Sequence, residues 1–208
     1  MSLFIAAAIV LIILCLSEFG WRKHLLSGEY GRKFVHISIG TFVAFWPFFL
    51  SWNEIRLISV AFLIVVAISK YLHLFNAVHS VQRPTYGEVF FAIVVGLLTF
   101  ITHSKGVYAA SLLQMSLADG FAAIFGTYYG GRTRYHFLGH IKSVVGTVTF
   151  FIVSFTILMG YSLFDTNGLP IIMVFFGSIT ATLLENIGIL GFDNLLVPLF
   201  IAVLLAHL

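Results

Sequence analysis

The sequence has very few charged residues and almost no cysteine. Charged residues make up 9% of its 208 residues, hydrophobic residues make up 60%, and the mean hydropathy is +1.06. A water-soluble globular protein cannot cover its surface with so few charges, so we exclude that class and predict an integral membrane protein. The single cysteine, Cys15, excludes an intrachain disulfide and a metal site built from cysteines.

Several familiar signatures are also missing. The sequence contains no Walker A motif, no dinucleotide fingerprint and no protein-kinase signature. It shows no linker, low-complexity tract or clean internal repeat, and we expect residues 1–208 to form a single integral membrane domain. The net charge of +3 and the pI near 9.1 give no separate support for nucleic-acid binding. The sequence leaves open whether the chain forms a homo-oligomer.

Long apolar runs separated by polar clusters are the main feature that is present. A membrane-spanning helix needs about 20 mostly apolar residues. The runs are continuously apolar, unlike the alternating strands of a membrane barrel, so we predict an all-α, multi-pass transmembrane helical bundle. The eight expected spans cover residues 3–20, 34–50, 55–72, 88–102, 107–125, 144–164, 169–189 and 195–207. The last run is the shortest, which leaves seven spans as an alternative.

Basic residues indicate how this bundle is oriented. If the N-terminus lies outside, nine of the eleven lysines and arginines fall on the inner side, and Arg56 and Lys105 fall on the other. The positive-inside rule then places both termini outside. A cleavable signal peptide is not expected, because basic residues follow the first run. The short chain favours a prokaryotic plasma membrane. The nine inner residues are Arg22, Lys23, Arg32, Lys33, Lys70, Arg83, Arg132, Arg134 and Lys142.

The inner loops also hold unusual polar residues. "EYGRKFVH" places Arg32 and His36 one helical turn apart, with Lys33 beside them. "RPTYGEVFF" opens a span with a Pro84 and Gly87 turn followed by Glu88. Taken singly, these residues also fit snorkelling anchors and a helix cap.

Two carboxylates lie within apolar runs on faces of small residues. Asp119 in "LADGFAAIFGTYYGG" and Glu185 in the seventh run must face the bundle interior or a hydrated cleft, because a lone carboxylate in lipid costs several kcal/mol. "GHIKSVVG" and "GFDNLLVPL" add Lys142, Asp193 and Asn194 at inner helix starts. The whole set predicts an active site at the cytoplasmic face, with a polar-lined packing seam as the structural alternative.

These residue types suit Mg²⁺ or another divalent cation together with phosphates. Mg²⁺ takes one or two carboxylates and leaves its other positions to water and phosphate oxygens. Gly130, Gly131, Arg132 and Arg134 could offer backbone N–H groups and guanidinium groups to an anion. If a nucleoside triphosphate enters from the cytosol, the other reactant comes from the bilayer, as a lipid alcohol or a lipid phosphate.

Four segments together resemble a known family. "RKFVH", "TYGEVFF", "LADGFAAIFGTYYGG" followed by "KSVVGT", and "LLENIGILGFDNLLVPL" occur in the order, spacing and setting of the polyprenol kinase family. That family includes dolichol kinase, phytol kinase and CTP-dependent diacylglycerol kinase. The resemblance implies transfer of a phosphate, typically from CTP, to the hydroxyl group of a polyprenol, a phytol-like isoprenoid alcohol or diacylglycerol.

The resemblance also identifies candidate site residues. We expect Asp119 and Glu185 to hold the metal, and Asp193 or Glu88 to act on the hydroxyl group. The candidate catalytic residues are Asp193, Glu88, Asp119 and His36. The candidate nucleotide-binding residues are Arg32, Lys33, Gly120, Gly130, Arg132, Arg134, Lys142 and Asn194, with Lys142, Arg132 and Arg32 at the phosphates.

The sequence departs from the family pattern twice. Val145 stands where the family usually has a glutamate, and "GTYYGG" replaces a basic run, so that the bases are displaced to Arg132 and Arg134. Both changes remove charge from the expected nucleotide site. A CTP:lipid-phosphate cytidylyltransferase is the nearest alternative, but its Ser-Pro-Lys-Lys-Thr-like segment is missing. A transporter or non-catalytic membrane protein is the second alternative, although the outer half of the predicted bundle carries almost no polar path.

Overall fold

The computed structural model describes residues 2–26, 28–72, 85–137, 140–164 and 168–206, with the side chains of residues 70–72 left out. Most of these residues are helical. The α-helices are α1 (Ser2–Arg22), α2 (Gly28–Ala44), α3 (Trp52–Leu72), α5 (Gly87–Ile101), α6 (Lys105–Leu113), α7 (Asp119–Tyr129), α8 (Val144–Phe164), α9 (Ile171–Ile187) and α10 (Asp193–Ala206). A π-helical segment, η2 (Gln114–Ala118), joins α6 to α7, and short 3-10 turns cover Trp46–Phe48 and Gly130–Arg132.

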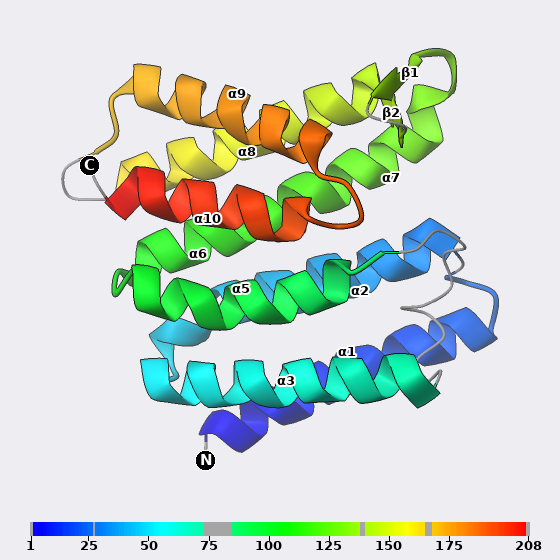
Figure 1. Ribbon diagram of the computed structural model, residues 1–208, viewed down its shortest axis with the longest axis vertical. Helices are drawn as coiled ribbons and strands as arrows, with labels where there is room; N and C mark the ends of the chain where they lie inside the picture. Colours follow the sequence, from blue (N-terminus) through cyan, green and yellow to red (C-terminus); the bar gives the residue numbers. More distant parts are fainter. Residues whose placement is uncertain (1, 27, 73–84, 138–139, 165–167, 207–208) are drawn as a thin grey trace.

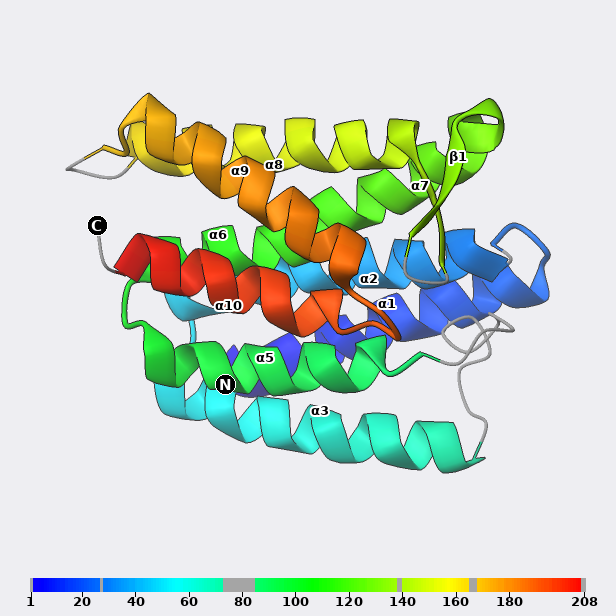
Figure 2. The same cartoon turned by 45° about the horizontal axis from the view of Figure 1, so that its top comes forward.

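The helices run back and forth along one direction (Figures 1 and 2). The start of α1 and the end of α10 lie at one end of the bundle. The starts of α2, α5 and α10 and the end of α7 lie at the other, beside two short strands, β1 (Arg134–Phe137) and β2 (His140–Ser143). We call these the termini end and the hairpin end. The loops that were expected on the inner side of the membrane and that the structure describes therefore gather at the hairpin end.

Length and composition support a helical membrane protein. Four helical stretches of the described chain are long and apolar enough to cross a bilayer: Ser2–Arg22, Trp52–Ser69, Lys105–Arg132 and Val144–Phe164. The helices α5, α9 and α10 are apolar but shorter. Large apolar side chains lie exposed on the outside, up to 92% for Phe164. A surface of this kind is suited to lipid.

The helix boundaries differ from the expected spans in instructive ways. α2 begins at Gly28 rather than residue 34, and it ends at Ala44 because Pro47 initiates a 3-10 turn. The fifth expected span, residues 107–125, is contained in a longer rod from Lys105 to Tyr129. The two strands are an addition to the all-α expectation. Arg83, Pro84 and His207, which the sequence analysis named, lie outside the described residues.

The rod formed by α6, η2 and α7 is the buried centre of the bundle, 67% buried over its membrane-length window. Its contact with α2 depends on two glycines. A Cβ atom at Gly40 would collide with Ser116, and a Cβ atom at Gly120 would collide with Ile37. Small residues of this kind let two helices approach closely. The approach brings Lys33 and His36 of α2 opposite Asp119.

The two strands form an antiparallel hairpin beside α7 and α8. The register pairs Arg134 with Ser143 and Tyr135 with Lys142. The Tyr135 hydroxyl lies 2.6 Å from Thr147 Oγ1 on α8 and 2.6 Å from Asn186 Oδ1 on α9. These bonds fix the hairpin against two helices. Because side chains alternate along a strand, His140 and Lys142 share one face of β2.

Candidate active site

A polar cleft of about 480 Å³ opens at the hairpin end. Its walls come from α2, α7, the hairpin, α8, the end of α9 and the start of α10. We call it the polar cleft. Residues far apart in the sequence therefore meet here, as the sequence analysis expected of the inner polar groups. The predicted site residues that line it are Arg32, Lys33, Asp119, Arg134, Lys142, Glu185, Asp193 and Asn194.

The ion pair between Lys33 and Asp119 lies at the deepest described part of the site. Lys33 Nζ donates to Asp119 Oδ2 over 2.5 Å, and the two residues are only 2% and 8% exposed. His36 Nε2 lies 3.4 Å from the same oxygen and 2.9 Å from the carbonyl oxygen of Met115. Buried opposite charges in contact compensate part of each other's desolvation cost, which explains how the carboxylate is accommodated inside the bundle.

The π-helical segment η2 explains the position of Asp119. Asp119 is the first residue after Gln114–Ala118, and its backbone N–H donates to the carbonyl oxygens of Gln114 and Ser116. A π-helical turn contains an extra residue and therefore rotates the helix beyond it, and such turns are frequent at functional sites. Here the turn also presents the Met115 carbonyl to His36.

A second ion pair joins the hairpin to α9. Lys142 Nζ contacts the carboxylate of Glu185 and donates to the Glu185 carbonyl oxygen over 3.1 Å. Burial lowers the pKa of Lys142, but the charge and hydrogen bond of Glu185 outweigh burial, so the pKa lies above its ordinary value. Lys142 is therefore charged at neutral pH and available to an anion in the cleft.

The start of α10 is held against the start of α5. Gly191 has a φ of +88°, which only glycine adopts without strain, and it lies so close to Gly87 that a side chain would collide. The Tyr86 N–H donates to the carbonyl oxygen of Leu190 over 2.9 Å, and Asn194 Nδ2 donates to the carbonyl oxygen of Gly87 over 3.1 Å. This contact brings Asp193 and Asn194 close to the segment that carries Glu88.

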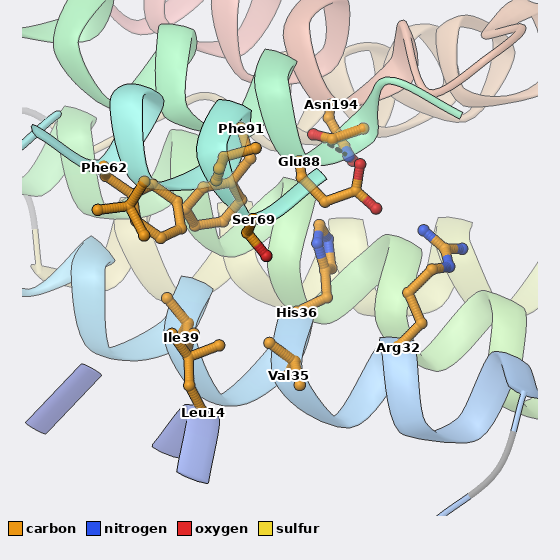
Figure 3. Close-up of a pocket in the computed structure, with 13 residues that line it drawn as sticks. Leu14, Arg32, Val35, His36, Ile39, Phe62, Ser69, Glu88, Phe91 and Asn194 are labelled. Atoms are coloured by element: carbon orange, nitrogen blue, oxygen red, sulfur yellow. Dashed lines mark hydrogen bonds between the residues drawn. The ribbon is translucent and has the colours of Figure 1, made fainter. Parts of the chain in front are cut away.

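An apolar groove adjoins the polar cleft. It holds about 80 Å³, and its walls come from α1, α2, α3, α5 and α10. Figure 3 shows polar side chains at one side of it and apolar side chains at the other. The groove and the polar cleft share Arg32 and Asn194. The polar side chains are Arg32, His36, Glu88, Ser69 and Asn194, and the apolar ones are Leu14, Val35, Ile39, Phe62, Val65, Val66 and Phe91.

Three predicted nucleotide-binding residues do not line the cleft. Gly120 lies in the helix contact with Ile37. Gly130 is buried against Ser143, where a Cβ atom would come within 2.5 Å of that side chain. Arg132 is exposed on the 3-10 turn before the hairpin, whereas Arg134 lies at the cleft. The two glycines thus serve helix packing and hairpin packing in this structure.

Sequence reasoning also missed residues that shape the cleft. Glu29 holds Arg32 by an ion pair of 2.5 Å and lines the cleft itself. Its position three residues before Arg32 in a helix was the available signal. His140 lines the cleft from β2. Recognising the alternating strands in "RYHF" and "HIKS" would have indicated that His140 and Lys142 share a face.

The donor set fits a cation that arrives with phosphates better than a resident metal. Among the described residues no three His, Cys, Asp or Glu side chains form a ready ligand cluster. Asp119 and Glu185 line one cleft, and each has a lysine partner. Mg²⁺ commonly uses one or two carboxylates and completes its shell with water and substrate phosphates. Asp119 and Glu185 match that requirement.

Comparison with known proteins gives one clear relative. A curated protein, the phytol kinase of the cyanobacterium Synechocystis sp., is 33% identical to this chain over 186 residues. The match covers 86% of this chain and 78% of that protein, so the likeness extends over most of the bundle. No family model matches the chain, and no solved structure does.

Proposed function

The chain belongs to the phytol and polyprenol kinase family, and from that premise we propose that it transfers a phosphoryl group from CTP to the hydroxyl group of a membrane lipid alcohol. The observation that supports this most is the meeting of two different spaces. A polar cleft with paired acids and bases touches an apolar groove at Arg32 and Asn194. A water-soluble phosphate donor and a lipid acceptor need neighbouring sites of these two kinds.

The proposal includes an orientation. All eight helical rods of the described chain would cross the membrane, the N-terminus would lie outside, and the hairpin end would face the cytoplasm of a prokaryotic cell. The nucleotide would then enter from the cytosol. In support, the basic residues Arg22, Arg32, Arg134 and Lys142 lie at the hairpin end, and Arg56 lies toward the termini end.

The cations of the polar cleft would bind the triphosphate. Lys142, Arg134 and Arg32 reach the cleft from β2, β1 and α2, so they surround it from different sides. Guanidinium groups bind phosphate oxygens through paired hydrogen bonds, and lysine supplies a compact charge. Asp119 and Glu185 would hold a divalent cation, which supplies neutralisation of phosphate charge when bound.

The acceptor hydroxyl would be placed at the junction of the cleft and the groove. Glu88 lies in the groove beside His36, while Asp193 lies in the cleft. We assign Glu88 as the carboxylate that takes the hydroxyl proton, because it is on the lipid side of the junction. The lipid oxygen then forms a bond to the γ-phosphorus, the bond to the β-phosphate oxygen breaks, and CDP leaves.

The test uses purified protein in lipid nanodiscs with Mg²⁺ and γ-labelled CTP. Geranylgeraniol, undecaprenol and diacylglycerol are offered in parallel, and labelled ATP and GTP replace CTP in matched reactions. We expect label in a lipid product and none with Asp119→Asn. The Arg56→Gln variant, altered near the termini end, controls for handling and folding.

Two results would overturn the proposal. Release of pyrophosphate with a lipid-phosphate substrate, without label in any alcohol, would make the chain a cytidylyltransferase. A folded protein that labels no lipid with any nucleotide would instead favour a non-catalytic or transport role.

A further inference from the structure

We propose that the apolar groove is the site for the part of the acceptor tail nearest the hydroxyl, that the tail enters sideways from the bilayer past Val65, and that Asn194 Oδ1 receives the hydroxyl group. This inference rests on the proposed function and adds a binding site to it. The occupant is a single-chain lipid alcohol. Three independent features of the groove support it.

The groove opens toward lipid. Val65 lines it and is nevertheless 47% exposed on the outer face of α3. Leu14 of α1 lines the same groove, so its outer rim lies between α1 and α3. Because both helices are long and apolar enough to lie in a bilayer, an opening between them faces hydrocarbon. An apolar tail could therefore pass from the bilayer into the groove without crossing water.

The inner end of the groove holds a hydrogen-bond acceptor that needs a donor. Asn194 is only 3% exposed, and its Nδ2 group is fixed by the carbonyl oxygen of Gly87 at 3.1 Å. Its Oδ1 atom has no hydrogen-bond partner among the residues that the structure describes. A buried acceptor without a partner is costly, so such an atom indicates a missing donor. A primary alcohol supplies one hydroxyl donor at this position, beside Glu88.

The volume of the groove limits what it can recognise. At about 10–15 Å³ for each water-sized group, its 80 Å³ accommodates roughly five to eight such groups. That is the first one or two isoprene units of a prenyl chain, and the rest of the tail would stay in the bilayer. The groove should therefore discriminate by shape near the hydroxyl and tolerate tail length. A glycerol carrying two acyl chains branches within this distance and does not fit.

Aromatic rings form the inner wall of the groove. Phe91 has edge-to-face contacts with His36 at 5.9 Å and with Phe62 at 6.0 Å between ring centroids. Figure 3 shows Phe62 and Phe91 together above Ile39. This chain of rings links the wall that would contact the tail to the histidine beside Asp119. Phe62 is the wall residue that comes from α3, the helix at the opening.

The first experiment measures binding without catalysis. A prenyl alcohol with a photoreactive group near its hydroxyl is incorporated into nanodiscs with the protein and no nucleotide, and labelled peptides are mapped by mass spectrometry. We expect adducts on α2 and α3 that unlabelled geranylgeraniol suppresses. Adducts spread over the outer faces of α8 and α9, without competition, would overturn the inference. Phosphorylation of a lipid together with that result would leave the proposed function intact.

The second experiment measures acceptor choice. Phe62→Ala is compared with Ile64→Ala, which alters a lipid-exposed residue of the same helix that does not line the groove. We expect Phe62→Ala to change the ratio of kcat/KM for a methyl-branched and an unbranched C20 alcohol by about tenfold, and Ile64→Ala to leave it unchanged. Equal ratios in both variants would overturn the assignment of Phe62.

Asn194 is tested by a pair of substitutions. Asn194→Leu removes the acceptor, and we expect KM for the alcohol to rise about tenfold while KM for the nucleotide stays within about twofold. Asn194→Asp keeps an acceptor oxygen and should retain the KM for the alcohol better than Asn194→Leu. Parallel loss of both KM values in the two variants would show a structural role and refute the assignment.

Discussion

The two ends of the bundle use similar charged residues in different ways. At the termini end Arg56 donates to the side chain and carbonyl oxygen of Thr99, each over 2.9 Å, and lies 4.2 Å from the Phe100 ring centroid. Glu54 caps its own helix through Ser51. Each of these groups is satisfied at the surface of a helix pair.

The ion pairs at the hairpin end have another consequence. Lys33 is 86 residues from Asp119, and Lys142 is 43 residues from Glu185, and all four line one cleft. Such pairs hold different helices around a cavity. The comparison teaches that the kind of residue does not identify a site, whereas convergence on a shared space does.

Asp119→Asn should break the comparison most strongly. It removes a proposed metal ligand, and we expect kcat to fall on the order of 10²- to 10³-fold. It also leaves Lys33 buried without its partner, at a cost of about 3–5 kcal/mol in the free energy of unfolding. The matched double variant Lys33→Met with Asp119→Asn should recover stability but not activity. Recovery of both would show that Asp119 is only structural. Labelled product and thermal melting are measured on the same preparations.

Lys142→Met should have the next largest effect. We expect KM for the nucleotide to rise and kcat/KM to fall about 10²-fold, because the cleft loses a cation that is held in place by Glu185. Arg132→Met is the matched control, since that arginine is exposed outside the cleft. Equal losses in the two variants would contradict the assignment of the cleft.

Tyr135→Phe tests whether the hairpin positions Lys142. The substitution removes hydroxyl contacts to Thr147 and Asn186 without changing the ring. At about 1 kcal/mol for each hydrogen bond, kcat/KM for the nucleotide should fall roughly three- to tenfold while KM for the lipid alcohol stays unchanged. An equal rise in both KM values would indicate general loosening of the fold instead.

Arg56→Gln should sharpen the comparison by doing little to catalysis. The variant loses hydrogen bonds to Thr99, so we expect about 1–2 kcal/mol less stability and unchanged kcat/KM. Phosphorylation assays and thermal melting in detergent measure the two effects. A large loss of activity would show that the termini end is coupled to the site.

Much of the fold can be predicted from the sequence because hydropathy marks apolar runs directly. In the part of the chain that the structure describes, every expected span contains a helix. The polar ends of helices are harder to predict, and α2 accordingly begins at Gly28 rather than residue 34. The hairpin was missed because its strands are four residues each and polar, and contacts with Thr147 and Asn186 hold it in place.

The candidate site was predictable in its residue types but not in its pairing. A carboxylate within an apolar run must find a partner, which identified Asp119 and Glu185. Nothing local assigns Lys33 to one and Lys142 to the other, because helix packing decides it. Gly120 and Gly130 were assigned to the nucleotide because a glycine that packs a helix and a glycine that contacts a ligand have the same letter. The groove needed the structure, since four helices contribute most of its wall.

The groove opens at Val65 toward lipid, so the acceptor would reach it by diffusion in two dimensions while the nucleotide arrives in three. The first reactant is then measured as a mole fraction of the membrane and the second as a molarity. Adding inert phospholipid at a fixed amount of acceptor would slow turnover, although no concentration in the test tube had changed. For such a protein the composition of the bilayer is itself a kinetic variable.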